Sequence, residues 1–335
     1  YWIDEEFLGT GSRQELYDKG HTILNRLENN CLLENVGRDS VKMHDVMRDT
    51  ALYIKGSGSR FKVQSGIRLK ELPSKQEWGE HLEKVSFMVN NVSEIPPHLS
   101  PNCEVLSTLL LQKNESLQRI SESFFQHMHR LSILDLSYTN VKQLPTSVSN
   151  LEKLKALVLR GCYNLRYVPS LEKLEALRKL DLSRTAIEKV PKGLEILSNL
   201  TYLNLCTESL KELPVAILPR LSCLQCLILY VESSRVKMNG FDAARLTKLE
   251  RFEGRFTELI DFNAYTKSIQ CQRLTSYLLV MAPLEAKFNV RQRVKGLSFY
   301  CFKLLIVDSD KGRNKAIKLA SGLQGTDAIK SIKIQ

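Results

Sequence analysis

The stretch Leu131-Ser-Ile-Leu134-Asp-Leu136 decides the fold, because its spacing of leucines recurs along the chain of 335 residues. Six regular copies of Leu-x-x-Leu-x-Leu start 25, 23, 23, 23 and 24 residues apart. The copies are Leu106/Leu109/Leu111, Leu131/Leu134/Leu136, Leu154/Leu157/Leu159, Leu177/Leu180/Leu182, Leu200/Leu203/Leu205 and Leu224/Leu227/Leu229. Looser copies lie outside these six, at Leu82/Val85/Phe87, Leu249/Phe252 and Leu274/Tyr277/Leu279. A fixed period of this length indicates a stack of structural repeats.

Each copy predicts a short strand whose leucines point inward, because side chains alternate between the two faces of a strand. A second apolar pair that ends in proline follows, as in Val141…Leu144-Pro145. Proline donates no hydrogen bond, so this part suits the side without the sheet. Small residues between the two parts are expected to cap the turn: Asn90, Asn114, Thr139, Cys162 and Thr185. The pattern predicts an α/β leucine-rich-repeat solenoid, a horseshoe with a parallel β-sheet on its concave face.

The strand residues between the leucines predict a concave recognition surface. Their chemistry is mixed, with no paired carboxylates and no Ser–His arrangement, so we assign no catalytic residue and favour binding over catalysis. The residues that we expect on this surface are Thr108, Gln112, Ile133, Asp135, Ser137, Val158, Arg160, Lys179, Asp181, Ser183, Tyr202 and Asn204.

Residues 1–58 lack the repeat and predict a separate module. Ser12-Arg-Gln-Glu15 is a capping box that starts a helix. Two short strands are expected at Cys31-Leu-Leu-Glu34 and Val41-Lys-Met43, and a second helix follows them. Helices plus a β-hairpin in so few residues predict a winged-helix module.

The domain organisation that follows from these patterns has three parts. The winged-helix module over residues 1–58 precedes a linker over 59–80 that begins near the run Gly56-Ser-Gly-Ser59. The leucine-rich-repeat domain takes residues 81–335, and we expect it to be regular over 82–230 and irregular over 231–335.

Charge is unevenly divided along the chain, whose net charge is +11. Residues 1–60 carry 8 basic and 10 acidic side chains, which gives −2 there and leaves +13 for the remainder. Residues 285–335 alone carry 11 basic and 4 acidic side chains. The negative module is a poor footprint for phosphate contacts, and no aromatic-interleaved basic motif of an RNA binder occurs. The basic excess therefore predicts an acidic protein partner, either another domain or an external protein, and no nucleic acid.

Metal and membrane sites are not predicted. The eight cysteines are scattered singly except Cys223-Leu-Gln-Cys226, which lacks the second ligand pair of a zinc site. His127-Met-His129 also lacks nearby ligands. No run approaches the roughly 18 apolar residues of a membrane-spanning helix. Isolated cysteines are typical of a reduced cytosolic protein, and the start without Met or signal peptide suggests a fragment.

Several motifs, in the expected order, resemble the end of the nucleotide-binding (NB-ARC) region of plant intracellular NLR disease-resistance proteins of the coiled-coil class. They are Tyr1-Trp-Ile-Asp-Glu-Glu-Phe7, Gly20-His-Thr-Ile-Leu-Asn-Arg-Leu27, Cys31-Leu-Leu-Glu34 and Val41-Lys-Met-His-Asp-Val46. The repeats, with Leu134-Asp-Leu-Ser and Val190-Pro-Lys-Gly-Leu194, are similar to those of the same family. The resemblance covers residues 1 to about 230.

The resemblance implies that Met43, His44 and Asp45 belong to a motif that senses bound ADP. His44 would contact the β-phosphate, for which an imidazole N–H is a suitable donor, and Asp45 would support the closed state. The alternative interpretation is a core Met43 beside two surface polar residues. No Gly-x-x-x-x-Gly-Lys-Ser/Thr loop occurs, so we expect no cofactor in this fragment and no hydrolysis; ADP or ATP is implied for the full-length protein.

The resemblance also implies a function in plant defence, as an immune receptor and not an enzyme. The repeats would recognise a pathogen effector or a guarded host protein and would contact the NB-ARC and coiled-coil domains of the same protein. The receptor would act in the cytoplasm or at the inner face of the plasma membrane, and would form an oligomer on activation.

Two other classes of protein stay open as alternatives. An extracellular leucine-rich-repeat receptor is favoured by glycosylation patterns at Asn91, Asn114 and Asn199. A substrate adaptor of a ubiquitin ligase would also use repeats, although no ligase-binding motif is evident.

Overall fold

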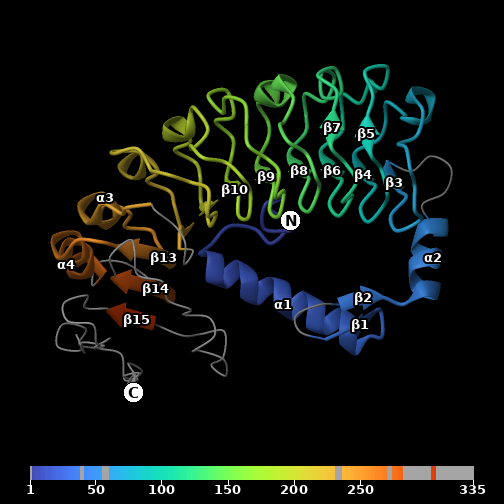
Figure 1. Ribbon diagram of the computed structural model, residues 1–335. Helices are drawn as coiled ribbons and strands as arrows, with labels where there is room; N and C mark the ends of the chain where they lie inside the picture. Colours follow the sequence, from blue (N-terminus) through green and yellow to red (C-terminus); the bar gives the residue numbers. More distant parts are fainter. Residues whose placement is uncertain are drawn as a thin grey trace.

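The computed structural model describes residues 2–37, 41–54, 60–230, 236–269, 274–281 and 303–306. Stacked repeats form an arc, and one long helix crosses the open side of the arc (Figure 1). The strands of the arc make one sheet of eleven in the order β15-β14-β13-β12-β11-β10-β9-β8-β6-β4-β3. The leucine-rich-repeat solenoid predicted from the sequence is confirmed.

The strands of the sheet follow the leucine pattern and are parallel throughout. Their bounds are β3 Phe61–Val63, β4 Lys84–Ser86, β6 Thr108–Leu110, β8 Ile133–Asp135, β9 Ala156–Val158, β10 Lys179–Asp181, β11 Tyr202–Asn204, β12 Cys226–Ile228, β13 Arg251–Phe256, β14 Ser276–Met281 and β15 Lys303–Ile306. Equivalent residues of adjacent repeats are paired, so that Leu134 lies beside Leu157 and Leu157 beside Leu180. These three leucines are 0% exposed, as the alternation of side chains predicts.

Small polar residues close the turn after each strand, as expected. Asn114 is 0% exposed; its amide nitrogen donates to the carbonyls of Phe87 and Leu111, and its oxygen accepts from the amide of Val92. In the next repeat, the hydroxyl of Thr139 donates to the carbonyl of Leu136 of the same turn. These bonds satisfy buried backbone groups that the turn would otherwise leave unpaired.

The residue before each of these polar residues has left-handed backbone. φ is 58° at Val89, 60° at Lys113, 57° at Tyr138 and 56° at Arg184, and Gly161 takes the equivalent place at 74°. Only glycine adopts this conformation without strain. The recurrence at successive repeats shows that the solenoid imposes the turn geometry over the local preference of a β-branched residue such as Val89.

The convex side carries short connecting elements, several of them beside a proline (Figure 1). They are the two-stranded parallel sheet of β5 Glu94–Ile95 and β7 Arg119–Ile120, and the 3-10 helices η2 Lys75–Glu77, η3 Thr146–Asn150, η4 Leu194–Ile196 and η5 Leu218–Arg220. A missing amide proton at proline costs nothing in these turns, because no sheet ladder needs it.

The repeats beyond residue 230 keep the sheet but change its packing. Helices α3 Gly240–Ala244 and α4 Leu259–Ser268 stand in the place of the convex turns. A cluster of rings, Phe252, Phe256, Phe262 and Tyr265, replaces the leucine frame, with centroids 4.8 to 6.2 Å apart. Of the basic stretch 285–335, the structure describes only the backbone of β15.

The first module contains helix α1 Arg13–Asn29, the antiparallel hairpin of β1 Leu33–Asn35 and β2 Val41–Met43, and helix α2 Asp45–Ile54. The capping box of Ser12 and Glu15 starts α1 and Asn30 ends it. The order of helix, hairpin and helix is the expected one, whereas the assignment as a winged helix stays a prediction.

The linker predicted over 59–80 is wrong in part. Phe61–Val63 pairs in parallel with Lys84–Ser86 and so forms the first strand of the solenoid sheet. The sequence lacks the leucine pattern there because this terminal strand has a repeat to cover on one side only. The solenoid therefore starts about twenty residues before the predicted boundary at residue 81.

We expect Asn114→Ala to lower the free energy of unfolding by about 2 to 4 kcal/mol, because the Val92 amide and the Leu111 carbonyl lose the bonds from Asn114 and the Phe87 carbonyl keeps only the bond from Asn90. The urea midpoint followed by circular dichroism measures the change. Asn199→Ala is the control, since Asn199 is exposed and makes one bond to the Glu175 carbonyl. Equal midpoints for the two variants would contradict the role of Asn114.

Candidate functional site

The concave side of the solenoid is covered in part by the chain's own first residues. Residues 2–8 form a compact turn, in which the amide of Phe7 donates to the carbonyl of Trp2 and the amide of Glu6 to that of Ile3. This turn presents three consecutive carboxylates, Asp4, Glu5 and Glu6, to the sheet. We call residues 2–8 the acidic segment.

Each carboxylate of the acidic segment contacts a basic residue of the repeats. Glu5 pairs with Lys84 and accepts a bond from the Thr108 hydroxyl at 2.5 Å. Lys179 lies 3.1 Å from Asp4, whose side chain is only 4% exposed.

Glu6 pairs with two cations, with Lys155 at 2.9 Å and with Arg178. The hydrogen bond that Lys155 donates lowers the pKa of Glu6, and the charge of Arg178 acts in the same direction.

The basic residues share one position in the repeat. Lys84 and Lys179 are the first residues of β4 and β10, and Lys155 and Arg178 immediately precede β9 and β10. Because all strands are parallel, the starts of the strands lie along one edge of the sheet. We call these four residues the basic edge. It concentrates positive charge where the acidic segment lies.

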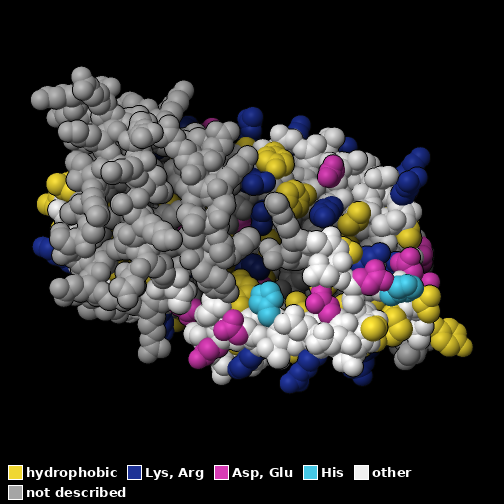
Figure 2. All heavy atoms as spheres, turned by 90° about the horizontal axis from the view of Figure 1, so that it is seen from below, with side chains coloured by type: hydrophobic (Ala, Val, Ile, Leu, Met, Phe, Trp, Pro, Cys, Tyr) yellow, Lys and Arg dark blue, Asp and Glu magenta, His cyan; other side chains and the backbone are white. Residues whose placement is uncertain are grey.

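Ionic contacts dominate this docking. Phe7 is 64% exposed and Trp2 39%, so their rings gain little from apolar burial, whereas Leu8 is 9% exposed and lies beside Gly20 of α1. Phe7 contributes a cation–π contact, with its ring 4.6 Å from the ammonium of Lys84. Seen from the open side, basic and acidic side chains lie close together on this face (Figure 2).

Helix α1 is held by its first turn. The carboxylate of Glu250 accepts from the backbone amides of Arg13 at 3.0 Å and Gln14 at 3.1 Å. These amides have no partner within a helix, and a carboxylate there also complements the helix dipole. The guanidinium of Arg13 lies 4.8 Å from the Tyr202 ring centroid, and Arg13 is 7% exposed. A residue of the far repeats thus caps a helix of the first module.

The twelve residues predicted for the concave surface do lie on β6, β8, β9, β10 and β11 or within two residues of them. Eight of them are buried: Thr108, Ile133, Asp135, Ser137, Val158, Asp181, Ser183 and Asn204. Gln112, Lys179 and Tyr202 are half-buried, and Arg160 is exposed. Only Thr108 and Lys179 bind the carboxylates of the acidic segment, and Tyr202 contacts Arg13.

Two of these residues, Asp135 and Asp181, place carboxylates on the concave side. Asp135 accepts from the Ser137 amide at 2.7 Å, and Asp181 accepts from the amide and hydroxyl of Ser183. Burial raises the pKa of Asp135, and the bonds from Ser137 oppose that shift. Their bonding is internal to the repeats, so they act as turn supports.

The sequence analysis missed the principal binding residues, which are Lys84, Lys155, Arg178 and Glu250 together with the acidic segment. All but Lys84 lie outside the strands, and the leucine pattern draws attention to the positions between leucines. The division of charge was the available signal: −2 over residues 1–60 against +13 for the rest.

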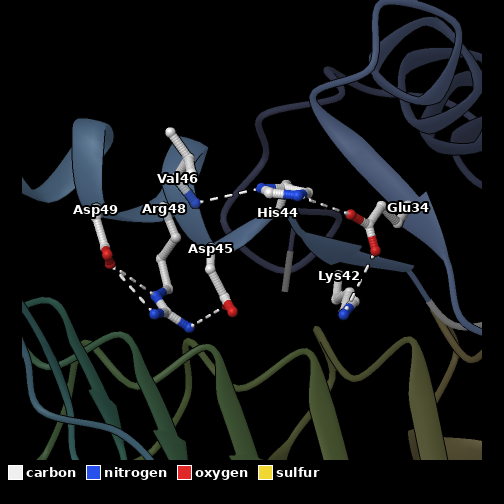
Figure 3. A network of polar contacts seen from close by, with 7 residues as sticks. All are labelled: Glu34, Lys42, His44, Asp45, Val46, Arg48 and Asp49. Atoms are coloured by element: carbon white, nitrogen blue, oxygen red, sulfur yellow. Dashed lines mark hydrogen bonds and ion pairs between the residues drawn. The ribbon is translucent and has the colours of Figure 1, made fainter.

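The Met-His-Asp motif lies apart from the basic edge, at the junction of β2 and α2. Met43 is 40% exposed, so it is not a core residue. His44 accepts from the Val46 amide through Nδ1 at 3.3 Å, and its Nε2 lies 3.7 Å from Glu34. Asp45 pairs with Arg48 at 3.0 Å. His44 turns toward Glu34 and Asp45 toward Arg48 (Figure 3).

The residues around His44 do not by themselves make a complete nucleotide site. The cations beside it are already paired, Lys42 with Glu34 and Arg48 with Asp45 and Asp49. The side chain of His44 is 56% exposed, so it can contribute to a site that other residues complete.

In the part of the chain that the structure describes, no group of three or more His, Cys, Asp or Glu could hold a metal ion. Among the same residues, no helix has both the length and the apolar character needed to cross a membrane.

The pH dependence of the docking follows from Glu6. Its pKa in the folded chain is below the ordinary 4.5, so its stabilising effect is complete above that value and is lost as pH falls through the lowered pKa. Trp2 is the exposed one of two tryptophans, whereas Trp78 is 4% exposed, so acrylamide quenching follows Trp2. We expect quenching to rise on acidification and, at neutral pH, on adding about 500 mM salt.

Glu6→Gln is the control for this titration and should reduce its amplitude. Circular dichroism at each pH verifies that the solenoid stays folded. Quenching that is the same in acid, in high salt and at neutral pH would show that the acidic segment is not held by charge.

We expect Glu250→Gln to loosen α1, because the amide group is neutral and its NH2 faces a backbone N–H. The loss is about 1 kcal/mol, roughly a fivefold faster exchange of the α1 amides with deuterium. Glu253→Gln is the matched control, since Glu253 lies on β13 beside Glu250 and pairs with Arg251 of the same strand. Unchanged exchange in Glu250→Gln would mean that the cap does not hold the helix.

The chain is similar in sequence to leucine-rich-repeat proteins and to plant disease-resistance proteins. The leucine rich repeat family matches residues 104–163. Disease resistance protein At4g27190 of Arabidopsis thaliana is 37% identical over 247 residues, which are 72% of this chain and 25% of that protein. Disease resistance protein SUMM2 of the same plant is 36% identical over 203 residues, 58% of this chain and 20% of that protein.

The chain spans about a quarter of the length of these curated relatives. Among solved structures, internalin C2 of Listeria monocytogenes has a TM-score of 0.48 and 17% identity, and the match covers 62% of this chain and 84% of that one. The repeats and the sequence identity to the resistance proteins agree with the motifs at Tyr1-Trp-Ile-Asp-Glu-Glu-Phe7 and Val41-Lys-Met-His-Asp-Val46. The chain is a leucine-rich-repeat segment of a plant disease-resistance protein.

Proposed function

We propose that this chain is the recognition and regulatory part of an intracellular immune receptor that acts in plant defence. The observation that carries the proposal is the docking of Asp4, Glu5 and Glu6 on the basic edge. In the proposed mechanism the solenoid holds the first module in a closed arrangement, and a protein ligand of the repeats shifts the balance toward an open one. The segment would bind and regulate; we propose no enzymatic step for it.

The kind of contact supports a switch. The pairs of Glu6 with Lys155 and Arg178 are partly exposed, and such pairs contribute about 0 to 1 kcal/mol each and are screened by salt. The carboxylates of Asp4 and Glu5 are 4% and 12% exposed, so their pairs are screened less. The Glu250 cap on α1 adds a second contact between the same two parts. A ligand therefore needs only a few kcal/mol of differential affinity to open the module.

The finer parts of the proposal concern the full-length receptor. The ligand would be a pathogen effector or a guarded host protein, and the NB-ARC and coiled-coil domains would contact the module. Met43, His44 and Asp45 would contribute to an ADP site that those domains complete, which accords with the exposed position of His44. We further propose action in the cytoplasm or at the inner face of the plasma membrane, and an oligomer on activation.

An extracellular receptor is less consistent with the geometry. Of the three glycosylation patterns, Asn91 and Asn199 are exposed, but Asn114 is 0% exposed and its amide nitrogen donates to two buried carbonyls. A glycan on Asn114 would break the turn that the residue closes.

Charge reversal in the full-length receptor tests the closed state. We expect Glu5→Lys to cause cell-death signalling in leaf tissue without a pathogen, because it repels Lys84. Lys84→Glu should do the same, and the two substitutions together should restore quiescence, since the ion pair re-forms with its charges exchanged.

Asp18→Lys is the matched control, because Asp18 is an exposed residue of α1 whose carboxylate meets only Gln14 among the described hydrogen bonds. Immunoblots verify equal protein amounts. Silent single variants, or a double variant as active as the singles, would refute the clamp between Glu5 and Lys84.

A further inference from the structure

We infer that the basic edge is a binding site for an acidic polypeptide segment of the external protein partner, and that residues 4–7 of this chain are its built-in competitor. The inference rests on the proposed function, since it assumes that the acidic segment can leave the basic edge. It adds the chemistry of the partner: clustered carboxylates followed by an aromatic residue.

The docked acidic segment shows which groups the basic edge binds. Three consecutive carboxylates reach four cations that start strands β4, β9 and β10, and the next residue, Phe7, places its ring over the ammonium of Lys84. The Thr108 hydroxyl donates to Glu5. A partner with the same order of groups would reproduce every one of these contacts.

Electrostatics also explains why displacement is feasible. Side-chain exposure is 44% at Arg178, 30% at Lys155 and 29% at Lys84, so these cations can be reached from solvent as the acidic segment lifts away. Without the segment, the basic edge would hold like charges close together, which costs free energy until another anion replaces it. An apolar or basic partner would not relieve the repulsion among these cations.

The covalent connection of the acidic segment to the solenoid determines how high the affinity of an external competitor must be. A segment joined to the same chain acts at an effective concentration of about millimolar, so the external peptide binds weakly to the intact chain. Neutralising the built-in segment removes this competition and leaves the basic edge unchanged. The comparison of these two proteins therefore isolates the site.

The experiment uses the full chain of 335 residues in two forms, unchanged and with Asp4→Asn/Glu5→Gln/Glu6→Gln. The probe is a fluorescent peptide with the sequence of residues 1–8, and fluorescence anisotropy measures its binding at about 50 mM and about 500 mM salt. We expect the neutralised chain to bind at least about tenfold more tightly than the unchanged chain. Binding should weaken at the higher salt.

Three controls separate the inference from simpler explanations. A peptide with Asn-Gln-Gln in place of its Asp-Glu-Glu should bind at least about tenfold more weakly. Adding Arg178→Glu and Lys179→Glu to the neutralised chain should abolish binding.

The third control is a chain with Glu152→Gln/Glu172→Gln/Glu175→Gln, which loses three exposed carboxylates of the repeats and should behave as the unchanged chain. Circular dichroism verifies the fold of each variant, and the single variant Glu6→Gln replaces the triple one if that one fails to fold.

Other results would overturn the inference. A folded, neutralised chain that does not bind the peptide shows that the basic edge holds its segment only through the tether. If the neutral peptide binds as tightly as the acidic peptide, the basic edge does not recognise carboxylates. Displacement of the peptide by inorganic tripolyphosphate at equal concentration shows a site for any polyanion. None of these results bears on the cell-death assay, which tests the closed state separately.

Discussion

No repeat of this chain can bury its own leucines, and this constraint governs the rest of the structure. Each three-residue strand is covered only when the next repeat stacks on it in register. The core that results is continuous, with Leu134, Leu157 and Leu180 fully buried. Stacking in one register also brings the starts of all strands to one edge, so that a basic residue at this position of several repeats creates a line of charge.

Two kinds of interface meet in the molecule. Within the solenoid, apolar side chains and buried turn residues such as Asn114 hold neighbouring repeats together, and their loss costs several kcal/mol. Between the solenoid and the first module, the ion pairs of the acidic segment and the Glu250 cap on α1 predominate, and an exposed ion pair or a cap contributes about 0 to 1 kcal/mol. Loss of one contact therefore costs more free energy in the first interface than in the second. This difference suits the regulatory role that we propose for the acidic segment.

The position of the binding residues also has a physical origin. Residues between the leucines are enclosed by the neighbouring strands, so eight of the twelve expected recognition residues are buried and serve the repeats themselves. Residues at the start of a strand lie at the edge of the sheet and can extend long side chains beyond it toward a partner. Lys155 and Arg178 therefore meet Glu6, and Thr108 and Lys179 are the residues from the predicted surface that join them.

The sequence by itself determined the solenoid, the positions of most strands, the capping box of Ser12 and Glu15, and the role of Asn114, because each depends on residues within one or two repeats. Only the tertiary structure decided that Phe61–Val63 joins the sheet, that Met43 is exposed, and that the first module docks on the concave side. The contact of Arg13 with Glu250 spans 237 residues, and local patterns carry no information at that separation. The opposite charges of the two parts indicated an attraction, but the register that brings Lys84, Lys155 and Lys179 to one edge exists only in the folded chain.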